Sequence, residues 1–367
     1  MADAWKLIAC ACAATCAATT SPLDALPRLE PRTFGVSLRR AAQGKVMVLL
    51  AGWPDDHRVW RHLVRTFESE YHIISFATPD LDREGLRHEP GYDFLTVPNM
   101  IAGSLEAHLG STRDDVVLIA HDWGAIWAYY IVQQPMWARR VTRLVAVDVG
   151  ASASNVSDTY ADIPGISHTT LWSIPYQWLC ASLFAIGRSI SPTLATFLGD
   201  AAWPLVPFLG PMGGDFDWAQ HAPRPREEVR WWMGYPYYYV WKHHRVWWQS
   251  PISPAFPTGI PTLFMYGAKK RTMFHSEAFE GRLNATDGSR VLRYEECGHW
   301  LMHEAPARFT DDVMKFLDDT EGAASRGGDT SSTSFKKGSE RGGSFMWTLV
   351  PLSILYAALA AGIMKMV

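Results

Sequence analysis

Short apolar runs alternate with longer amphipathic segments along most of this chain. The runs are rich in β-branched and aromatic residues, which favour strands. They cover residues 33–39, 45–51, 71–77, 116–120, 141–147, 261–266 and 290–294. Apolar positions with helical spacing occur in residues 95–109, 125–133 and 305–317. This alternation predicts an α/β fold, with a mostly parallel sheet covered by helices on both faces.

Residues 151–256 interrupt the alternation. The block is mainly helical in pattern, is broken by prolines and is rich in Trp and Tyr. We predict that it forms a helical cap inserted into the core. The α/β core then comprises residues 33–150 and 257–320, and residues 1–32 form a separate amino-terminal segment.

The carboxy-terminal part changes character twice. Residues 321–344 are rich in Gly and Ser and lack the apolar content needed to fold, which predicts a disordered linker. Residues 345–364 carry no charge and have about the ~20 residues that a membrane-spanning helix needs. Basic residues precede this run, which predicts a single-pass tail anchor with the folded domain in the cytosol. A glycolipid-anchor signal is the rival, and Lys365 argues against it.

The amino terminus leaves two interpretations open. Lys6 and the Ala/Cys-rich run after it suit a secretory signal peptide, which would be removed. Asp3 weakens the positive region, and the run is only mildly apolar. An ordinary amino-terminal helix fits equally well.

Composition limits the partners and cofactors. The chain has 367 residues, of which 48% are hydrophobic, so it can bury a large core. A formal charge of -3 gives no reason to expect nucleic acid. The five cysteines and the pair His243-His244 lack the spacing of a metal site, so we predict no metal and no cofactor.

The most informative pattern follows the run at residues 116–120. It reads His121-Asp122-Trp123-Gly124 and leads directly into a helical segment, which predicts a strand, a sharp turn and a helix. The central residue is Asp122, a carboxylate that is anionic at neutral pH and needs no base to act as a nucleophile. The alternative interpretation of Asp122 is a helix N-cap.

Three separated motifs resemble the α/β-hydrolase superfamily, in particular its epoxide hydrolase and haloalkane dehalogenase branch. The resemblance covers roughly residues 33–320, with a replaceable cap in the middle. The motifs follow strands in the expected order: Ala51-Gly52-Trp53-Pro54, His121-Asp122-Trp123-Gly124-Ala125 and Cys297-Gly298-His299-Trp300.

The resemblance implies a covalent mechanism. Asp122 would attack a carbon and form an alkyl ester, and His299 would activate the water that hydrolyses the ester. The backbone N–H groups of Trp53 and Trp123 would form the oxyanion hole. One departure is Ala51, which stands where the family normally has histidine.

The acid that orients the histidine is a second departure. It normally follows the strand that ends near Gly267, where this chain has Ala268-Lys269-Lys270-Arg271 and no carboxylate. Some dehalogenase relatives carry the acid at the end of the strand after the elbow helix, where Asp148 lies. We therefore assign the role to Asp148, with a turn-capping Asp as the alternative and Glu277 as a poorer candidate acid.

Cap tyrosines are the candidate substrate-binding residues. Epoxide hydrolases use two of them as proton donors to the opening ring, and a neutral phenol suits this role. The second position falls in the run that contains Tyr235, Tyr238 and Tyr239, and the first on Tyr176 or Tyr160. For each, aromatic packing is the alternative. A dehalogenase would use the Trp123 indole and a polar side chain at residue 53.

The predicted function is a hydrolase of the epoxide-hydrolase-like kind that acts on a lipophilic small molecule. The aromatic cap and the predicted anchor both favour a substrate that partitions into membranes. An esterase or a haloalkane dehalogenase is an alternative. A non-catalytic, membrane-tethered relative is another, because the expected acid after Gly267 is missing.

Overall fold

The structure is a computed structural model that describes most of the predicted core and part of the predicted cap. The described residues are 27–35, 45–86, 88, 90–110, 115–152, 170–203, 222–246, 254–270 and 273–324. The predicted signal-like segment, most of the linker and the predicted transmembrane helix lie outside these residues, as does Tyr160.

Within the described residues, the strands form one seven-stranded sheet in the order β1-β3-β2-β4-β5-β6-β7. β1 pairs antiparallel with β3, and the other neighbours pair in parallel. The strands are β1 (Arg32–Gly35), β2 (Val46–Leu50), β3 (His72–Phe76), β4 (Val116–His121), β5 (Val141–Val147), β6 (Thr262–Gly267) and β7 (Arg290–Tyr294). The predicted α/β fold with a mostly parallel sheet is confirmed.

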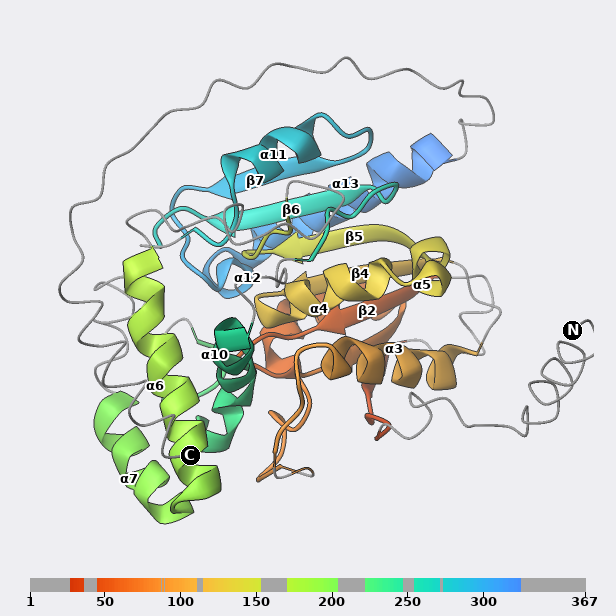
Figure 1. Ribbon diagram of the computed structural model, residues 1–367. Coiled ribbons are helices and arrows are strands. Elements are labelled where there is room, and N and C mark those ends of the chain that lie inside the picture. Colours follow the sequence, from red (N-terminus) through yellow and green to blue (C-terminus); the bar gives the residue numbers. More distant parts are fainter. Residues whose placement is uncertain are drawn as a thin grey trace, which may run out of the picture.

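Helices cover both faces of this sheet, as Figure 1 shows. Alternate residues of β2 belong to different cores, because side chains along a strand point to opposite faces. One core also contains side chains of α3 (Thr96–Leu109), α4 (Trp123–Val132) and α11 (Glu277–Asn284). The other contains side chains of α2 (Arg61–Phe67), α12 (Leu301–Glu304) and α13 (Pro306–Ala324). The remaining core elements are η3 (His57–Trp60) and α5 (Pro135–Arg140).

The observed elements differ from the predicted ones mainly at their ends. α3 begins one residue after the predicted start, at Thr96. α13 continues to Ala324, beyond the predicted end at residue 317, because Thr320 is still buried and bonds to the backbone of Phe316. The first residues of the predicted linker are therefore helical.

The described parts of the predicted cap are helical. They contain α6 (Thr170–Ser189), α7 (Pro192–Ala202), η6 (Arg226–Glu228), η7 (Trp231–Gly234) and α10 (Tyr235–Val246). α6, α7 and α10 lie together at one side of the sheet in Figure 1. α6 packs against both other helices, and Gly234 allows the backbone of Cys180 to approach closely.

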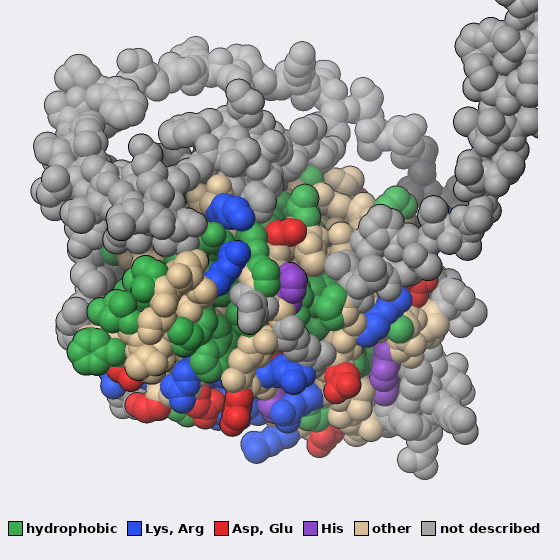
Figure 2. Space-filling view, turned by 60° about the horizontal axis from the view of Figure 1, so that its bottom comes forward, with side chains coloured by type: hydrophobic (Ala, Val, Ile, Leu, Met, Phe, Trp, Pro, Cys, Tyr) green, Lys and Arg blue, Asp and Glu red, His purple; other side chains and the backbone are tan. Residues whose placement is uncertain are grey.

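The cap also carries apolar side chains that face solvent. Ile190, Leu194 and Phe197 are exposed at the end of α6 and along α7. Figure 2 shows hydrophobic side chains gathered on the side where Figure 1 has these two helices. None of the helices in the described part of the chain is long and apolar enough to cross a membrane.

Candidate active site

The predicted elbow lies between β4 and α4, at the carboxyl edge of the sheet. Asp122 has φ 54° and ψ -122°, a region that non-glycine residues rarely adopt and that costs about 1–3 kcal/mol. A Cβ at Gly124 would lie 2.2 Å from the carbonyl oxygen of Leu50, and one at Gly52 would lie 2.5 Å from Cβ of Asp122. Glycine is therefore required at both positions for the turn to close. The tight turn holds the Asp122 side chain at the end of a central strand.

Backbone donors surround the Asp122 carboxylate. The N–H group of Trp53 donates to Oδ1 at 2.8 Å, and the backbone of Trp123 also bonds to the carboxylate. Asp122 occupies the N-cap position of α4, as the alternative interpretation expected, but its side chain makes no capping hydrogen bond there. Burial raises the pKa of Asp122, although His299 and the two N–H groups oppose this effect. Both donors predicted to form an oxyanion hole thus already bond to the Asp122 carboxylate.

His299 lies between two carboxylates. Its Nδ1 is 2.5 Å from Oδ2 of Asp148, and its Nε2 is 3.8 Å from Oδ2 of Asp122. A bond to Asp148 requires a proton on Nδ1, which leaves the lone pair on Nε2 directed toward Asp122. Burial alone would lower the pKa of His299, but Asp148 and Asp122 outweigh burial and raise it.

Asp148 follows β5 and is completely buried. Its backbone has φ 74°, and its N–H group donates to Met265 in the neighbouring strand at 2.8 Å. Burial would raise the pKa of Asp148, but the charges of Lys270 and His299 lower it well below the usual range, so the carboxyl is ionised. Glu277, the poorer candidate acid, is exposed at the start of α11.

Two tyrosines of the cap come close to the elbow. Tyr176 from α6 and Tyr237 from α10 have hydroxyl oxygens 3.5 Å apart. The Tyr237 ring centre lies 5.1 Å from that of Trp53 and 5.2 Å from that of Trp123. Burial raises the pKa of both phenols, and the charge of Asp122 raises it further. Both groups are therefore neutral hydrogen-bond donors at pH 7.

The other tyrosines predicted on this helix point elsewhere. Tyr235 donates its hydroxyl to the carbonyl of Pro79 at 2.9 Å, and Tyr239 donates to the carbonyl of Pro90 at 2.8 Å. The Tyr238 ring packs 5.2 Å from the Phe184 ring. Residues 235, 238 and 239 lie on adjoining faces of a helix, whereas residue 237 is rotated by about 200° from residue 235. Helical phase was the signal that distinguishes Tyr237 from the tyrosines named from the sequence.

A third buried acid, which the sequence interpretation did not single out, lies behind His299. Asp55 accepts a hydrogen bond from the Trp300 indole at 2.7 Å, and burial raises its pKa to about 7. His121 lies between Asp55 and His299: its Nε2 donates to the His299 carbonyl at 3.0 Å. Burial lowers the pKa of His121, so this ring is neutral. The group fixes the backbone on which His299 is carried.

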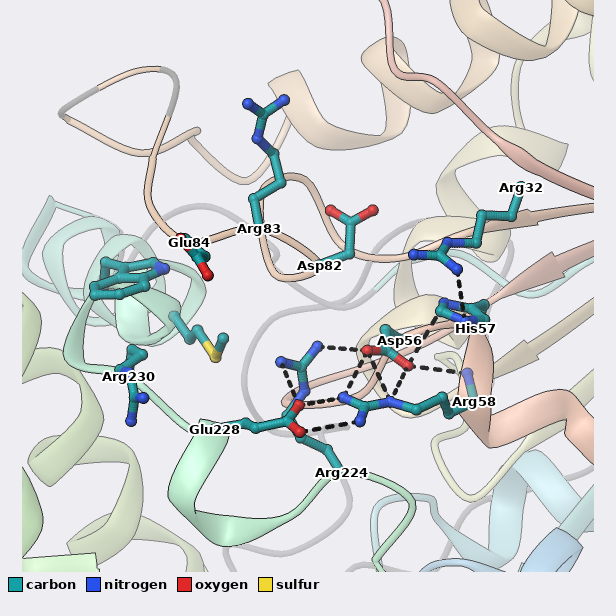
Figure 3. A pocket seen from close by; sticks show the side chains of 12 residues that line it. Arg32, Asp56, His57, Arg58, Asp82, Arg83, Glu84, Arg224, Glu228 and Arg230 are labelled. Carbon is teal, nitrogen blue, oxygen red and sulfur yellow. Dashed lines mark hydrogen bonds and ion pairs between the residues drawn. The ribbon is translucent and has the colours of Figure 1, made fainter.

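A cavity of about 650 Å³ lies between the core and the cap, and Figure 3 shows its charged lining. Arg224 and Arg58 both donate to Asp56, and Arg58 also pairs with Glu228 at 2.5 Å. Burial would raise the pKa of Asp56, but the two arginines lower it. These ion pairs join the loop after β2 to the segment that contains η6. We interpret the network as a clamp between core and cap.

Most of the chain matches a known protein family. A profile described as "Alpha/beta hydrolase family" matches residues 47–312. The chain belongs to this family. The predicted superfamily and the predicted class of enzyme, a hydrolase, are both confirmed.

Relatives of this α/β hydrolase have several described activities. The chain is 24% identical over 297 residues to a cis-3-alkyl-4-alkyloxetan-2-one decarboxylase of Shewanella oneidensis. This match covers 77% of this chain and 85% of the relative. The chain is also 35% identical over 92 residues to a soluble epoxide hydrolase of a Corynebacterium species, a match that covers 24% of this chain and 30% of the relative. An epoxide hydrolase structure from Bacillus megaterium matches with a TM-score of 0.52 and 18% identity, covering 79% of this chain and 96% of that chain. The structural match shows a shared fold.

Proposed function

We propose that this α/β hydrolase opens an epoxide on a lipophilic small molecule through a covalent ester on Asp122. One observation carries the proposal: Nε2 of His299 faces Asp122 at 3.8 Å while Nδ1 is bound to Asp148. Carboxylate, imidazole and orienting acid are the groups that attack on carbon followed by ester hydrolysis requires. Because Asp148 fills the third place, the absence of an acid after Gly267 no longer favours a non-catalytic relative.

The first step is attack on a ring carbon. Oδ1 of Asp122 is held by Trp53, so Oδ2 is the oxygen that forms the new bond to carbon. The ring C–O bond breaks, and its electron pair stays on the leaving oxygen. Tyr176 or Tyr237 donates a proton to that oxygen and becomes a phenolate. The pair of neutral phenols near Asp122 supports this role.

The second step is hydrolysis of the ester. His299 removes a proton from water through Nε2, and the resulting hydroxide attacks Cγ of Asp122. Negative charge then develops on Oδ1, where the N–H group of Trp53 already donates, and the N–H group of Trp123 also bonds to the carboxyl group. Collapse of this intermediate releases the diol and restores the carboxylate. The proton on His299 returns through solvent to the phenolate.

A second candidate substrate class is a disubstituted oxetan-2-one. The relative that carries this name matches 77% of the chain, far more than the epoxide hydrolase from Corynebacterium. Epoxides and oxetan-2-ones are both strained rings with an electrophilic carbon next to oxygen, so Asp122 could attack either. A halide is less well served, because the Trp53 indole already donates to the carbonyl of Met233 at 2.9 Å.

Products and isotopes distinguish these possibilities. The full chain is incubated with styrene oxide, trans-stilbene oxide and a cis-3,4-dialkyl-oxetan-2-one, and products are identified by mass spectrometry. We expect diols from the epoxides; an alkene and CO2 from the oxetan-2-one instead would favour the second candidate. In a single turnover in H₂¹⁸O, the label should enter Asp122 and be absent from the diol. Label in the diol at first turnover would rule out the ester.

We also propose that residues 345–364 anchor the protein in a membrane with its catalytic domain in the cytosol. The support is the uncharged run and its basic flank. The exposed Ile190, Leu194 and Phe197 on the cap are consistent with uptake of lipophilic substrate near a bilayer. The full chain should stay in the membrane fraction after a carbonate wash, and a variant lacking residues 345–367 should not. Protease is then added to intact vesicles whose cytosolic face points outward. A catalytic domain that resists this protease would contradict the proposed orientation.

A further inference from the structure

The loop after β6 places a lysine inside the site. Lys270 and Asp148 form an ion pair in which neither side chain is exposed to solvent. Lys270 donates to Oδ1 of Asp148, and His299 occupies Oδ2 of the same carboxylate. The two oxygens of Asp148 are thus divided between a lysine and the histidine.

The loop that carries Lys270 is held by the backbone. Ala268 donates to the carbonyl of Tyr294 at 2.9 Å, and Lys269 donates to the carbonyl of Cys297 at 3.0 Å. These bonds fix the backbone just before Lys270, whose side chain then enters the core. Gly267 allows this approach, because a Cβ there would lie 1.9 Å from the carbonyl oxygen of Gly298. The ammonium group is built into the same strand ends that carry His299.

A buried lysine is costly unless it is paired, so its presence requires a reason. Burial lowers the pKa of Lys270, while Asp148 opposes this effect. With Lys270 charged, the charges of Lys270 and Asp148 cancel. Without it, Asp148 and Asp122 would present two anions to one imidazole, and the imidazole would hold a proton more tightly.

We propose that Lys270 is a positioning residue that fixes the Asp148 carboxylate toward His299 and sets the pH range in which His299 acts as general base. The inference rests on the proposed function, because it assigns to Lys270 a part in ester hydrolysis. It makes no claim on the first step, in which Asp122 attacks carbon.

Other titratable or charged groups also surround these residues. The groups that face His299 from the surrounding elements are Asp122, Asp148, His121, Asp55 and Lys270. The groups that face Lys270 are Asp148, Asp122, Glu304 and His275. Asp148 raises the pKa of His299. Among these groups, the positive charge of Lys270 opposes this effect most directly, because Lys270 and His299 bind the same carboxylate.

The test compares the pH dependence of hydrolysis in Lys270→Met with that of wild type. Lys269→Met is a matched control, because Lys269 is adjacent, carries the same charge and is exposed beside Glu296. Ester formed with styrene oxide is followed by mass spectrometry as it decays between pH 5 and pH 9. The acidic limb should move up by about one pH unit in Lys270→Met, because a more basic His299 stays protonated to higher pH. Lys269→Met and Lys270→Arg should follow wild type.

A second measurement needs no substrate. The His299 ring is titrated by NMR in wild type, Lys270→Met and Lys269→Met, with His299→Gln for assignment. The pKa of His299 should rise in Lys270→Met alone; an unchanged pKa, or equal shifts in both lysine variants, overturns the proposal. If Lys270→Met does not fold, Lys270→Gln serves as the neutral variant. Absence of the ester in both wild type and His299→Gln would count against the proposed function, and the titration would still decide the role of Lys270.

Discussion

The core and the cap meet at Asp122, but they hold their side chains there by different means. Asp122, Asp148 and His299 come from loops that follow strands, and hydrogen bonds between neighbouring strand ends fix their backbones. Tyr176 and Tyr237 come from helices, and their rings pack against Trp53 of the core at ring-centre distances of 6.5 and 5.1 Å. The core part of the site is therefore placed by backbone hydrogen bonds, whereas its cap part is placed by the packing of side chains on helices.

The largest effect should come from the core residues that form and break the ester in the proposed mechanism. Asp122→Asn removes the nucleophile and should reduce turnover by roughly 10⁴-fold or more, with no covalent adduct. His299→Gln should reduce turnover similarly but accumulate the adduct, because the first step does not need the base. Intact mass after incubation with epoxide distinguishes the two. Equal adduct in both variants, or turnover equal to wild type, would remove the ester from the mechanism.

Asp148→Asn should be the next most damaging change. Loss of the carboxylate releases the orientation of His299, and turnover should fall by about 10³- to 10⁴-fold. The variant should also lose about 3–5 kcal/mol of unfolding free energy, because Lys270 is left buried without a counter-charge. Urea denaturation measures this loss. The double variant Asp148→Asn/Lys270→Met should recover most of the stability and none of the turnover; full additivity of the two losses would show that the pair is not coupled.

The same division explains what could be predicted from the sequence. The sequence predicted that Asp122, His299 and Asp148 lie together, because a strand followed by a turn fixes where a residue lies on the sheet edge. The structure brings these three side chains together. Within the tyrosine run at residues 235–239 the sequence did not single out Tyr237. Each step along a helix rotates a side chain by about 100°, so a run of tyrosines does not reveal which one faces the elbow. Lys270 was seen only as a missing acid, since the sequence does not show that a cation is buried against Asp148.

Cap tyrosines should give smaller effects that fall on the first step. Tyr237→Phe or Tyr176→Phe removes a proton donor and should slow adduct formation by about 10²-fold, while decay of the ester stays near the wild-type rate. Tyr235→Phe and Tyr239→Phe are matched controls, because their hydroxyls bond to backbone carbonyls. Each should cost about 1 kcal/mol of stability and leave adduct formation within a few-fold of wild type. A larger kinetic loss in Tyr235→Phe than in Tyr237→Phe would reverse the assignment of the helix face.

The smallest effect on turnover should follow from Asp55→Asn, which changes the core behind the site and leaves the contacts of Asp122 intact. The pKa of Asp55 is raised by burial from 3.8 to about 7, so the folded protein keeps a proton that the unfolded chain releases. The free energy of unfolding should therefore fall as the pH rises from about 4 to about 7, by a few kcal/mol at most. Asparagine still accepts from Trp300 and has no proton to lose, so the variant should lack this part of the slope. Thermal unfolding at several pH values gives the free energy of unfolding of both proteins. If this free energy depends on pH in the same way in both, Asp55 is ionised in the folded state, and the buried group behind His299 carries a negative charge.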